Sequence, residues 1–219
     1  MYLFNRLAGY TEKDLKKGRK SPVGLAREKY PRPSVQELTD ILSLSNTVGF
    51  LIARNPYERL VSGYREKILG AIRGSDHDKL GKEIVVKYRN LDPKLYKYGK
   101  TFPTFTEFVN YIVDEANAGH SLDMHWTPVY QFCTPCQVNL NHIIRFETFD
   151  RDTLEILSRS ALTKYLPKKE KTLKKNVSKG GKNTSSLVEI FLNELTPDLR
   201  RNLYNLYEID FDILGYEPM

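Results

Sequence analysis

The chain has 219 residues, 40% of them hydrophobic and 11% aromatic, which excludes wholesale disorder and fits one globular domain. Its apolar runs are far shorter than the roughly 20 residues of a membrane-spanning helix, and its first twenty residues are too charged for a signal peptide. Lys and Arg number 34 against 27 Asp and Glu, a net charge of +7. This charge favours an anionic partner, although a well-solvated lysine-rich surface explains it equally well.

The first part of the chain predicts a short helix and a buried strand. Met1–Tyr10 has the apolar pattern of a helix interior, so we expect further chain before it. Ser34 followed by Glu37 forms a capping-box pattern at the start of a short helix. The continuous apolar run Thr47–Ala53 is typical of a strand buried on both faces, as in a parallel sheet.

A helix is predicted directly after this strand. Asn55 is suited to cap it, Pro56 to occupy its first position and Glu58 to lie at its third. Apolar side chains then recur at helical spacing, namely Tyr57, Leu60, Val61, Tyr64 and Ile68. The segment is therefore a strand, a tight turn and a helix.

The rest of the chain continues the alternation of strands and helices. Further elements are expected at Thr104–Val113 (helix), His142–Phe149 (strand), and Asp150–Leu157, Ser186–Leu195 and Pro197–Tyr207 (helices). Long loops are expected over Ser75–Thr101 and Leu166–Thr184. Strands that alternate with helices predict an α/β fold with a mainly parallel sheet.

The strand–turn–helix segment also carries the residues of a phosphate site. Arg54 follows the strand at its carboxyl end, where α/β proteins bind ligands. The start of the next helix offers backbone N–H groups to an anion. Ser62 lies one turn after Arg59, so guanidinium and hydroxyl groups gather near this helix start. Alternatively, the arginines pair with carboxylates and Ser62 is a small surface residue.

Three segments resemble the carbohydrate sulfotransferase family that includes chondroitin and dermatan 4-O-sulfotransferases. The residues 54–67 follow Arg-x-Pro-x-x-Arg-x-x-Ser-x-Tyr-x-x-Lys, similar to the motif that binds the 3′-phosphate of 3′-phosphoadenosine 5′-phosphosulfate (PAPS). The residues 125–148 contain His-Trp, Cys-x-Pro-Cys and Glu-Thr in the family's order. The residues 206–216 resemble its C-terminal signature.

The resemblance implies a fold, a donor and an activity. It implies a P-loop-like sulfotransferase fold, with a central parallel sheet flanked by helices, over a single domain 1–219. It also implies transfer of the sulfuryl group of PAPS, without a metal, to a hydroxyl of a glycan or a chondroitin- or dermatan-like glycosaminoglycan. Arg54, Arg59 and Ser62 would then bind the cofactor.

The same resemblance implies that the chain is incomplete. The family's N-terminal strand and its phosphosulfate loop, with a lysine, should lie just before the helix that begins here at Met1. We therefore expect this chain alone to be inactive or nearly so, and the alternative function is a catalytically inactive binding domain. The family further implies the Golgi lumen and a type II membrane protein, through an N-terminal anchor that this sequence lacks.

Two residues compete for the role of catalytic base. His125 stands beside Trp126, and an imidazole titrates near neutrality, which suits it to take the hydroxyl proton. Packing or hydrogen bonding is the structural alternative for His125. Glu147 at a strand end is the rival base, with an ion pair as its alternative. The sequence leaves this choice open.

The two cysteines, Cys133 and Cys136, allow three interpretations. A zinc site would need further ligands, and His125 and His142 flank the pair at irregular spacing. A redox site is expected at a helix start after a strand, which this segment lacks. A structural disulfide or a buried pair of thiols is the remaining interpretation.

The basic segment near residue 175 has two possible roles. Asn176 and Asn183 begin N-glycosylation sequons, which fits a lumenal protein. Lys179 and Lys182 lie in a basic loop that is either solvated or a lid over the nucleotide or the acidic polysaccharide. A nucleic-acid binder is disfavoured, because no nucleic-acid motif accompanies the positive charge.

Overall fold

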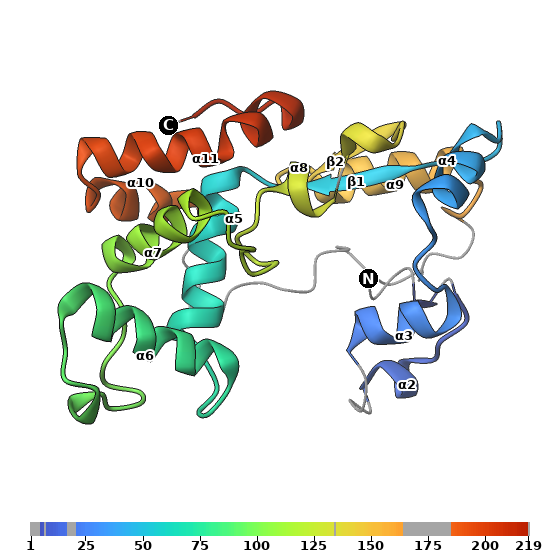
Figure 1. The fold of residues 1–219 in the computed structure, drawn as a ribbon. Coiled ribbons are helices and arrows are strands. Elements are labelled where there is room, and N and C mark those ends of the chain that lie inside the picture. The colour runs from blue at the N-terminus through green and yellow to red at the C-terminus, as the bar shows by residue number, and fades with distance from the viewer. Residues whose placement is uncertain (1–4, 7, 17–20, 134, 164–184, 219) are drawn as a thin grey trace. The chain divides into compact units, whose positions relative to one another are not determined.

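The chain forms two compact units. The computed structural model describes residues 5–6, 8–16, 21–133, 135–163 and 185–218. One unit, the sheet unit, comprises Met1–Ile52 and Pro135–Asn176, and the other, the helical unit, comprises Ala53–Thr134 and Val177–Met219. Figure 1 shows their helices and strands. The single domain expected over 1–219 stays a prediction.

The two strands that the structure describes lie in the sheet unit, apart from Ala53, the last residue of the first strand. Strands β1 (Phe50–Ala53) and β2 (His142–Arg145) form a two-stranded parallel sheet. Its helices are α2 (Glu12–Lys16), α3 (Pro22–Lys29), α4 (Val35–Ser43) and α9 (Phe149–Arg159), with a 3₁₀ turn, η3 (Pro135–Gln137). The predicted capping box of α4 is confirmed, because Ser34 and Glu37 bond to each other's backbone N–H groups.

Both strands are shorter than the sequence pattern suggests. β1 begins at Phe50 rather than Thr47, and Ile52 is 43% exposed, so the expectation of burial on both faces is wrong for this strand. β2 ends at Arg145 because the chain turns there, with the N–H of Thr148 bonded to the carbonyl oxygen of Arg145. The helix α9 follows at once, four residues after β2 ends.

The helical unit holds the main core. Its helices are α5 (Pro56–Gly63), the π-helical turn η1 (Tyr64–Leu69), α6 (Asp76–Arg89), the 3₁₀ turn η2 (Pro93–Leu95), α7 (Phe105–Asn117), α8 (Val129–Phe132), α10 (Ser185–Asn193) and α11 (Pro197–Leu214). The helix α7 packs against α6 and α11, and α10 packs against α5 (Figure 1). The core contains the predicted apolar face of this segment, with Tyr57, Leu60 and Val61 in α5 and Tyr64 and Ile68 in η1.

Two expectations for the helical unit are wrong. The predicted loop Ser75–Thr101 contains α6, which Ser75 caps by accepting a hydrogen bond from the N–H of Asp78. Buried Ile84 and Val85 lie on its inner face, and the dense charges around them hid this pattern. The last helix continues to Leu214 instead of ending at Tyr207, because buried side chains recur at helical spacing up to its end.

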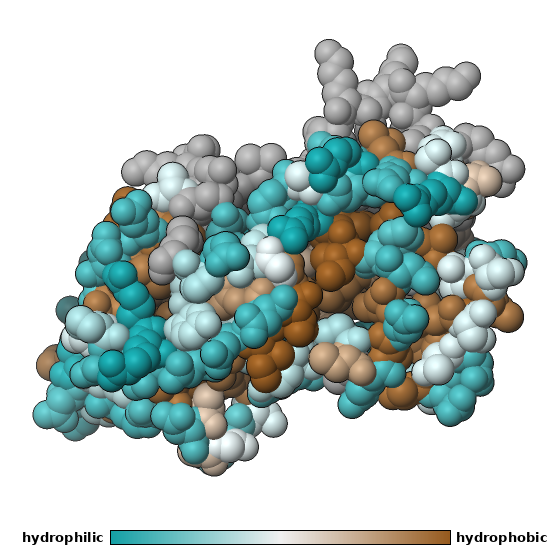
Figure 2. All heavy atoms as spheres, turned by 90° about the horizontal axis from the view of Figure 1, so that it is seen from above, coloured by the Kyte–Doolittle hydropathy of each residue, from teal (hydrophilic) through white to brown (hydrophobic). Residues whose placement is uncertain are grey.

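The α/β class is confirmed, although helices dominate the described residues. Hydrophilic side chains cover much of the face seen in Figure 2, with hydrophobic ones gathered between them. No described helix has both the length and the apolar character needed to cross a membrane. The predicted loop Leu166–Thr184 lies outside the described residues.

Candidate functional site

The start of α5 has the local structure that its sequence predicts. The side-chain oxygen of Asn55 accepts hydrogen bonds from the N–H groups of Tyr57 (3.0 Å) and Glu58 (3.3 Å). Pro56 occupies the first turn, where its missing N–H costs nothing. The helix therefore begins directly after β1, with Arg54 between the strand and the cap.

Arg54 lies at this helix start in an ion pair. Its Nε is 3.2 Å from Oε2 of Glu58, one helical turn further on, and the Glu58 residue is 8% exposed. This ion pair is the one that the sequence offered as the alternative to phosphate binding by Arg54. It also holds a cationic, partly exposed guanidinium beside the positive end of α5.

Arg59 contacts the loop that carries His125. Its guanidinium donates to the backbone carbonyl oxygens of Thr127 and Met124, both at 2.7 Å. The planar fork of an arginine suits two such acceptors at once. Arg59 therefore clamps the loop between α7 and α8 to α5, and no sequence pattern pointed to this contact.

The other expected cofactor residue, Ser62, lies further along α5. Its side chain is half-buried, and its hydroxyl has no hydrogen-bond partner among the described residues. Next to it, Gly63 allows a close approach, because a Cβ there would lie 3.3 Å from the carbonyl oxygen of His125. The α5 helix thus contacts the His125 loop through a glycine and an arginine.

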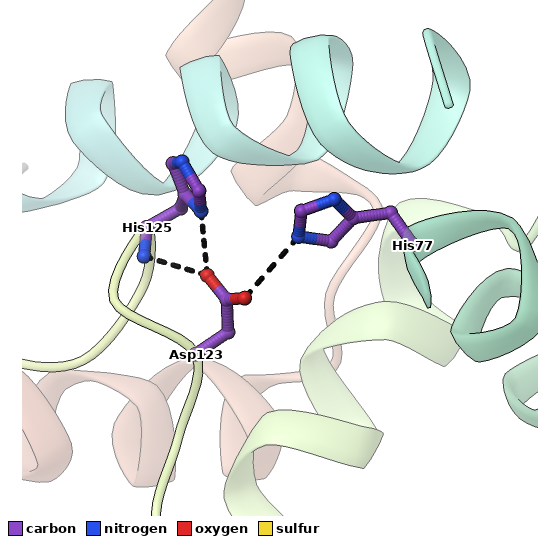
Figure 3. Close-up of side chains that lie close together, drawn as sticks. All are labelled: His77, Asp123 and His125. Atoms are coloured by element: carbon purple, nitrogen blue, oxygen red, sulfur yellow. Dashed lines mark hydrogen bonds and ion pairs between the residues drawn. The ribbon is translucent and has the colours of Figure 1, made fainter. Parts of the chain in front are cut away.

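His125 belongs to a hydrogen-bonded cluster of three side chains (Figure 3). Its Nδ1 is 2.6 Å from Oδ1 of Asp123, and its backbone N–H donates to the same oxygen at 2.8 Å. The other carboxylate oxygen lies 3.2 Å from Nε2 of His77, which comes from the first turn of α6. Neither His77 nor Asp123 was predicted from the sequence.

The electrostatics of the cluster favour one tautomer of His125. Burial raises the pKa of Asp123, but hydrogen bonds from the backbone and side chain of His125 and from His77 outweigh this and lower it below its ordinary value. An ionised Asp123 accepts the Nδ1–H of His125, so Nε2 carries the lone pair. Nε2 has no hydrogen-bond partner in the part of the chain that the structure describes. His125 can therefore accept a proton there.

Trp126 fixes the loop that carries His125. Its side chain is fully buried and packs edge-on against Phe108, with ring centroids 5.2 Å apart. The hydroxyl of Tyr207 donates to the Trp126 carbonyl oxygen. The ring of His77 lies 5.9 Å from that of Trp126, so the cluster rests on the core.

Asp210 holds the other end of this loop. Its buried carboxylate accepts hydrogen bonds from the N–H groups of Val129 (2.6 Å) and Tyr130 (2.8 Å), at the start of α8. Burial raises the pKa of Asp210, and the two N–H donors and the charge of Arg59 oppose that rise. The C-terminal segment that resembled a family signature thus supports the segment that contains His125.

The structure describes the remaining candidates only in part. Glu147 is exposed and lies in the sheet unit between β2 and α9. Cys133 and Cys136 are both exposed, so the interpretation as buried thiols is wrong, and no disulfide joins them among the described residues. Four further candidates lie outside the described residues, namely Asn176, Lys179, Lys182 and Asn183.

One group of described side chains has the composition of a metal site. Ligand atoms of His77, Asp123 and His125 all lie within 4.8 Å of one another. Two imidazoles and a carboxylate are a donor set that zinc accepts with a fourth position open. In the described part of the chain, neither cysteine belongs to such a group.

Comparison with known proteins points to one family. The profile of the sulfotransferase family matches residues 1–217. The chain is 29% identical to carbohydrate sulfotransferase 11 of Mus musculus over 175 residues, which cover 79% of this chain and 48% of that protein. It is 33% identical to carbohydrate sulfotransferase 14 of Danio rerio over 170 residues, or 76% of this chain and 43% of that protein. The chain thus spans about half or less of these curated relatives, and no solved structure matches it significantly.

Proposed function

The chain belongs to the sulfotransferase family, and we propose that it transfers the sulfuryl group of PAPS to a hydroxyl of a glycan in the Golgi lumen. The names of its relatives support a carbohydrate acceptor. A chondroitin- or dermatan-like polysaccharide, which is acidic, fits the net charge of +7.

The observation that carries this proposal is the hydrogen bond between Asp123 and His125. A carboxylate on Nδ1 fixes the orientation and the tautomer of the imidazole, as in other enzymes that use histidine as a general base. The lone pair on Nε2 is then available for the proton of the acceptor hydroxyl. His125 is therefore our proposed base in preference to Glu147.

Arg54, before the start of α5, and Ser62, near its end, are our proposed contacts of the nucleotide donor. Arg54 supplies a cation at a helix N-terminus, and the hydroxyl of Ser62 has no partner among the described residues. Both suit the 3′-phosphate of PAPS, which when bound provides the activated sulfuryl group. Arg59 acts on the site through the loop that it clamps.

The proton leaves the acceptor hydroxyl as its oxygen bonds to sulfur, and His125 receives it at Nε2. The bond between sulfur and the 5′-phosphate oxygen breaks, and 3′-phosphoadenosine 5′-phosphate leaves with the electron pair. General-base catalysis of this kind contributes about 100- to 10,000-fold in rate.

Transfer of radiolabelled sulfate from PAPS to desulfated chondroitin tests the proposal, with this chain assayed beside a version extended at its N-terminus, in which the variants are compared. His125→Ala should reduce kcat about 100-fold or more, while His142→Gln, a change in β2, should not. A loss confined to Glu147→Gln would make Glu147 the base. If the extended version also binds the desulfated nucleotide but transfers no sulfate, the protein is a binding domain.

A further inference from the structure

A groove in the helical unit lies against the loop that precedes His125. Its volume is about 510 Å³, within the range of sites that hold small organic ligands. The end of α7 and the following residues form one wall, and α8 and α11 form the others. No residue proposed for donor binding or catalysis lines it.

Amide side chains dominate the polar lining of this groove. They come from all three walls, namely Asn117, Gln131, Asn202 and Asn205. Each amide offers two N–H donors and a carbonyl acceptor, so it can bond to hydroxyl groups in either direction. Val113, Leu122 and Leu206 add apolar atoms to the same lining. Hydroxyl groups around an apolar ring face are the matching surface of a sugar.

The groove lacks charge in the part of the chain that the structure describes. No Lys, Arg, Asp or Glu lines it there. Its two titratable residues are His120, whose Nδ1 is 2.8 Å from a carboxylate oxygen of Glu115, and Tyr130, whose hydroxyl accepts a hydrogen bond from Gln131. A sulfated sugar or a nucleotide would find no cation here, whereas an uncharged sugar needs none.

The groove and the proposed base share one short loop. Ser121 and Leu122 line the groove, and Asp123 follows directly. The hydroxyl of Thr127 donates to the carbonyl oxygen of Leu122 at 2.7 Å and so closes this loop on itself. A ligand in the groove would therefore contact the segment that positions His125.

We propose that this groove binds an uncharged sugar unit of the acceptor glycan. The proposal rests on the proposed function, because it assigns the acceptor a place beside the proposed base. The unit that the enzyme recognises is then a neutral sugar. This sugar lies next to the hydroxyl that receives the sulfate. Acidic groups of the same polysaccharide would lie outside the groove.

The test uses N-acetyllactosamine, a neutral disaccharide with hydroxyl and acetamido groups, and its 6-sulfated form. Ligand-observed saturation-transfer NMR on the whole chain, without PAPS, should detect the neutral sugar and show weaker binding of the sulfated one. Asn205→Ala and Asn117→Ala should each raise the Kd for the neutral sugar about fivefold, as expected for the loss of one neutral hydrogen bond. The matched control is Asn139→Ala, an exposed asparagine of the sheet unit.

Each outcome bears on one proposal. Equal binding of the neutral and sulfated sugars, or an unchanged Kd in both groove variants, overturns the groove assignment. Circular dichroism of each variant excludes misfolding, and Asn205→Gln, which keeps the amide, should retain more affinity than Asn205→Ala. An N-terminally extended protein that binds the sugar in the groove but transfers no sulfate contradicts the proposed function and leaves the groove assignment intact. Normal transfer with an unchanged acceptor KM in the groove variants contradicts the groove assignment and leaves the proposed function intact.

Discussion

The hydroxyl of Tyr207 in α11 donates a hydrogen bond to the backbone carbonyl oxygen of Trp126, the neighbour of His125. Both residues are buried, and 81 residues of chain separate them. Burial raises the pKa of Tyr207, so its proton stays available for this bond throughout the physiological range. The C-terminal helix therefore fixes the loop on which the proposed base lies.

Tyr207→Phe should destabilise the chain and disturb this loop. The change leaves a buried carbonyl oxygen without its donor, which costs about 1–3 kcal/mol of unfolding free energy. Urea denaturation measures the loss, and Tyr204→Phe serves as the control because the Tyr204 ring stacks on Phe211 at 6.0 Å. Equal stabilities of the Tyr207 variant and the wild type would show that the bond contributes nothing.

Arg59→Lys should separate a loop clamp from a cofactor contact. Lysine keeps the charge but cannot span the carbonyl oxygens of Met124 and Thr127 as a guanidinium does. We expect kcat to fall and the affinity for 3′-phosphoadenosine 5′-phosphate to stay within about twofold, since the lost bonds are in the loop. A large loss of nucleotide affinity with unchanged kcat would instead indicate that Arg59 contacts the nucleotide.

Arg54→Ala should weaken nucleotide binding. The loss of a charged hydrogen bond to a phosphate costs about 1.5–3 kcal/mol, or roughly 10- to 150-fold in Kd by calorimetry. Glu58→Gln is the matched control, because it breaks the ion pair at 3.2 Å and keeps the arginine. If the two variants lose affinity equally, the pair is structural and Arg54 reaches the nucleotide only through the fold.

The local features of this fold were predictable, and the long-range ones were not. Asn55, Pro56 and Glu58 act within one helical turn, so their order in the sequence was enough to predict the start of α5. Arg59 finds its acceptors 65 and 68 residues away, and His77 lies 46 residues before Asp123. Such contacts depend on how the helices pack against one another, and residue spacing along the chain does not predict that packing.

The candidate site shows the same division. His125 was recognised from its own motif, but the carboxylate that orients it was missed although it lies only two residues earlier. The Asp-x-His spacing was the signal that could have found Asp123. No local signal leads to His77, because α6 was itself predicted as a loop.

Asp123→Asn should change how stability depends on pH. The pKa of Asp123 lies below its ordinary 3.8, so the folded chain binds this proton less tightly than the unfolded chain. The carboxylate therefore contributes stability above pH 3.8, and this contribution disappears as the pH falls through the folded pKa. The difference in unfolding free energy between wild type and variant should shrink on acidification, whereas for exposed Asp76→Asn it should stay small throughout. A difference that grows towards low pH would contradict the assignment.

Zinc should bind to His77, Asp123 and His125 and inhibit transfer. Their ligand atoms lie within 4.8 Å of one another, and a zinc ion held there would take the imidazole and carboxylate electron pairs on which the proposed base depends. Calorimetry should show one site that weakens as the pH falls, because protons compete for the imidazoles. His77→Ala should weaken zinc binding at least tenfold, since two protein ligands remain. His120→Ala, which removes a histidine outside the cluster, should bind zinc as the wild type does. Equal zinc affinity of the wild type and His77→Ala would exclude this cluster as the metal site.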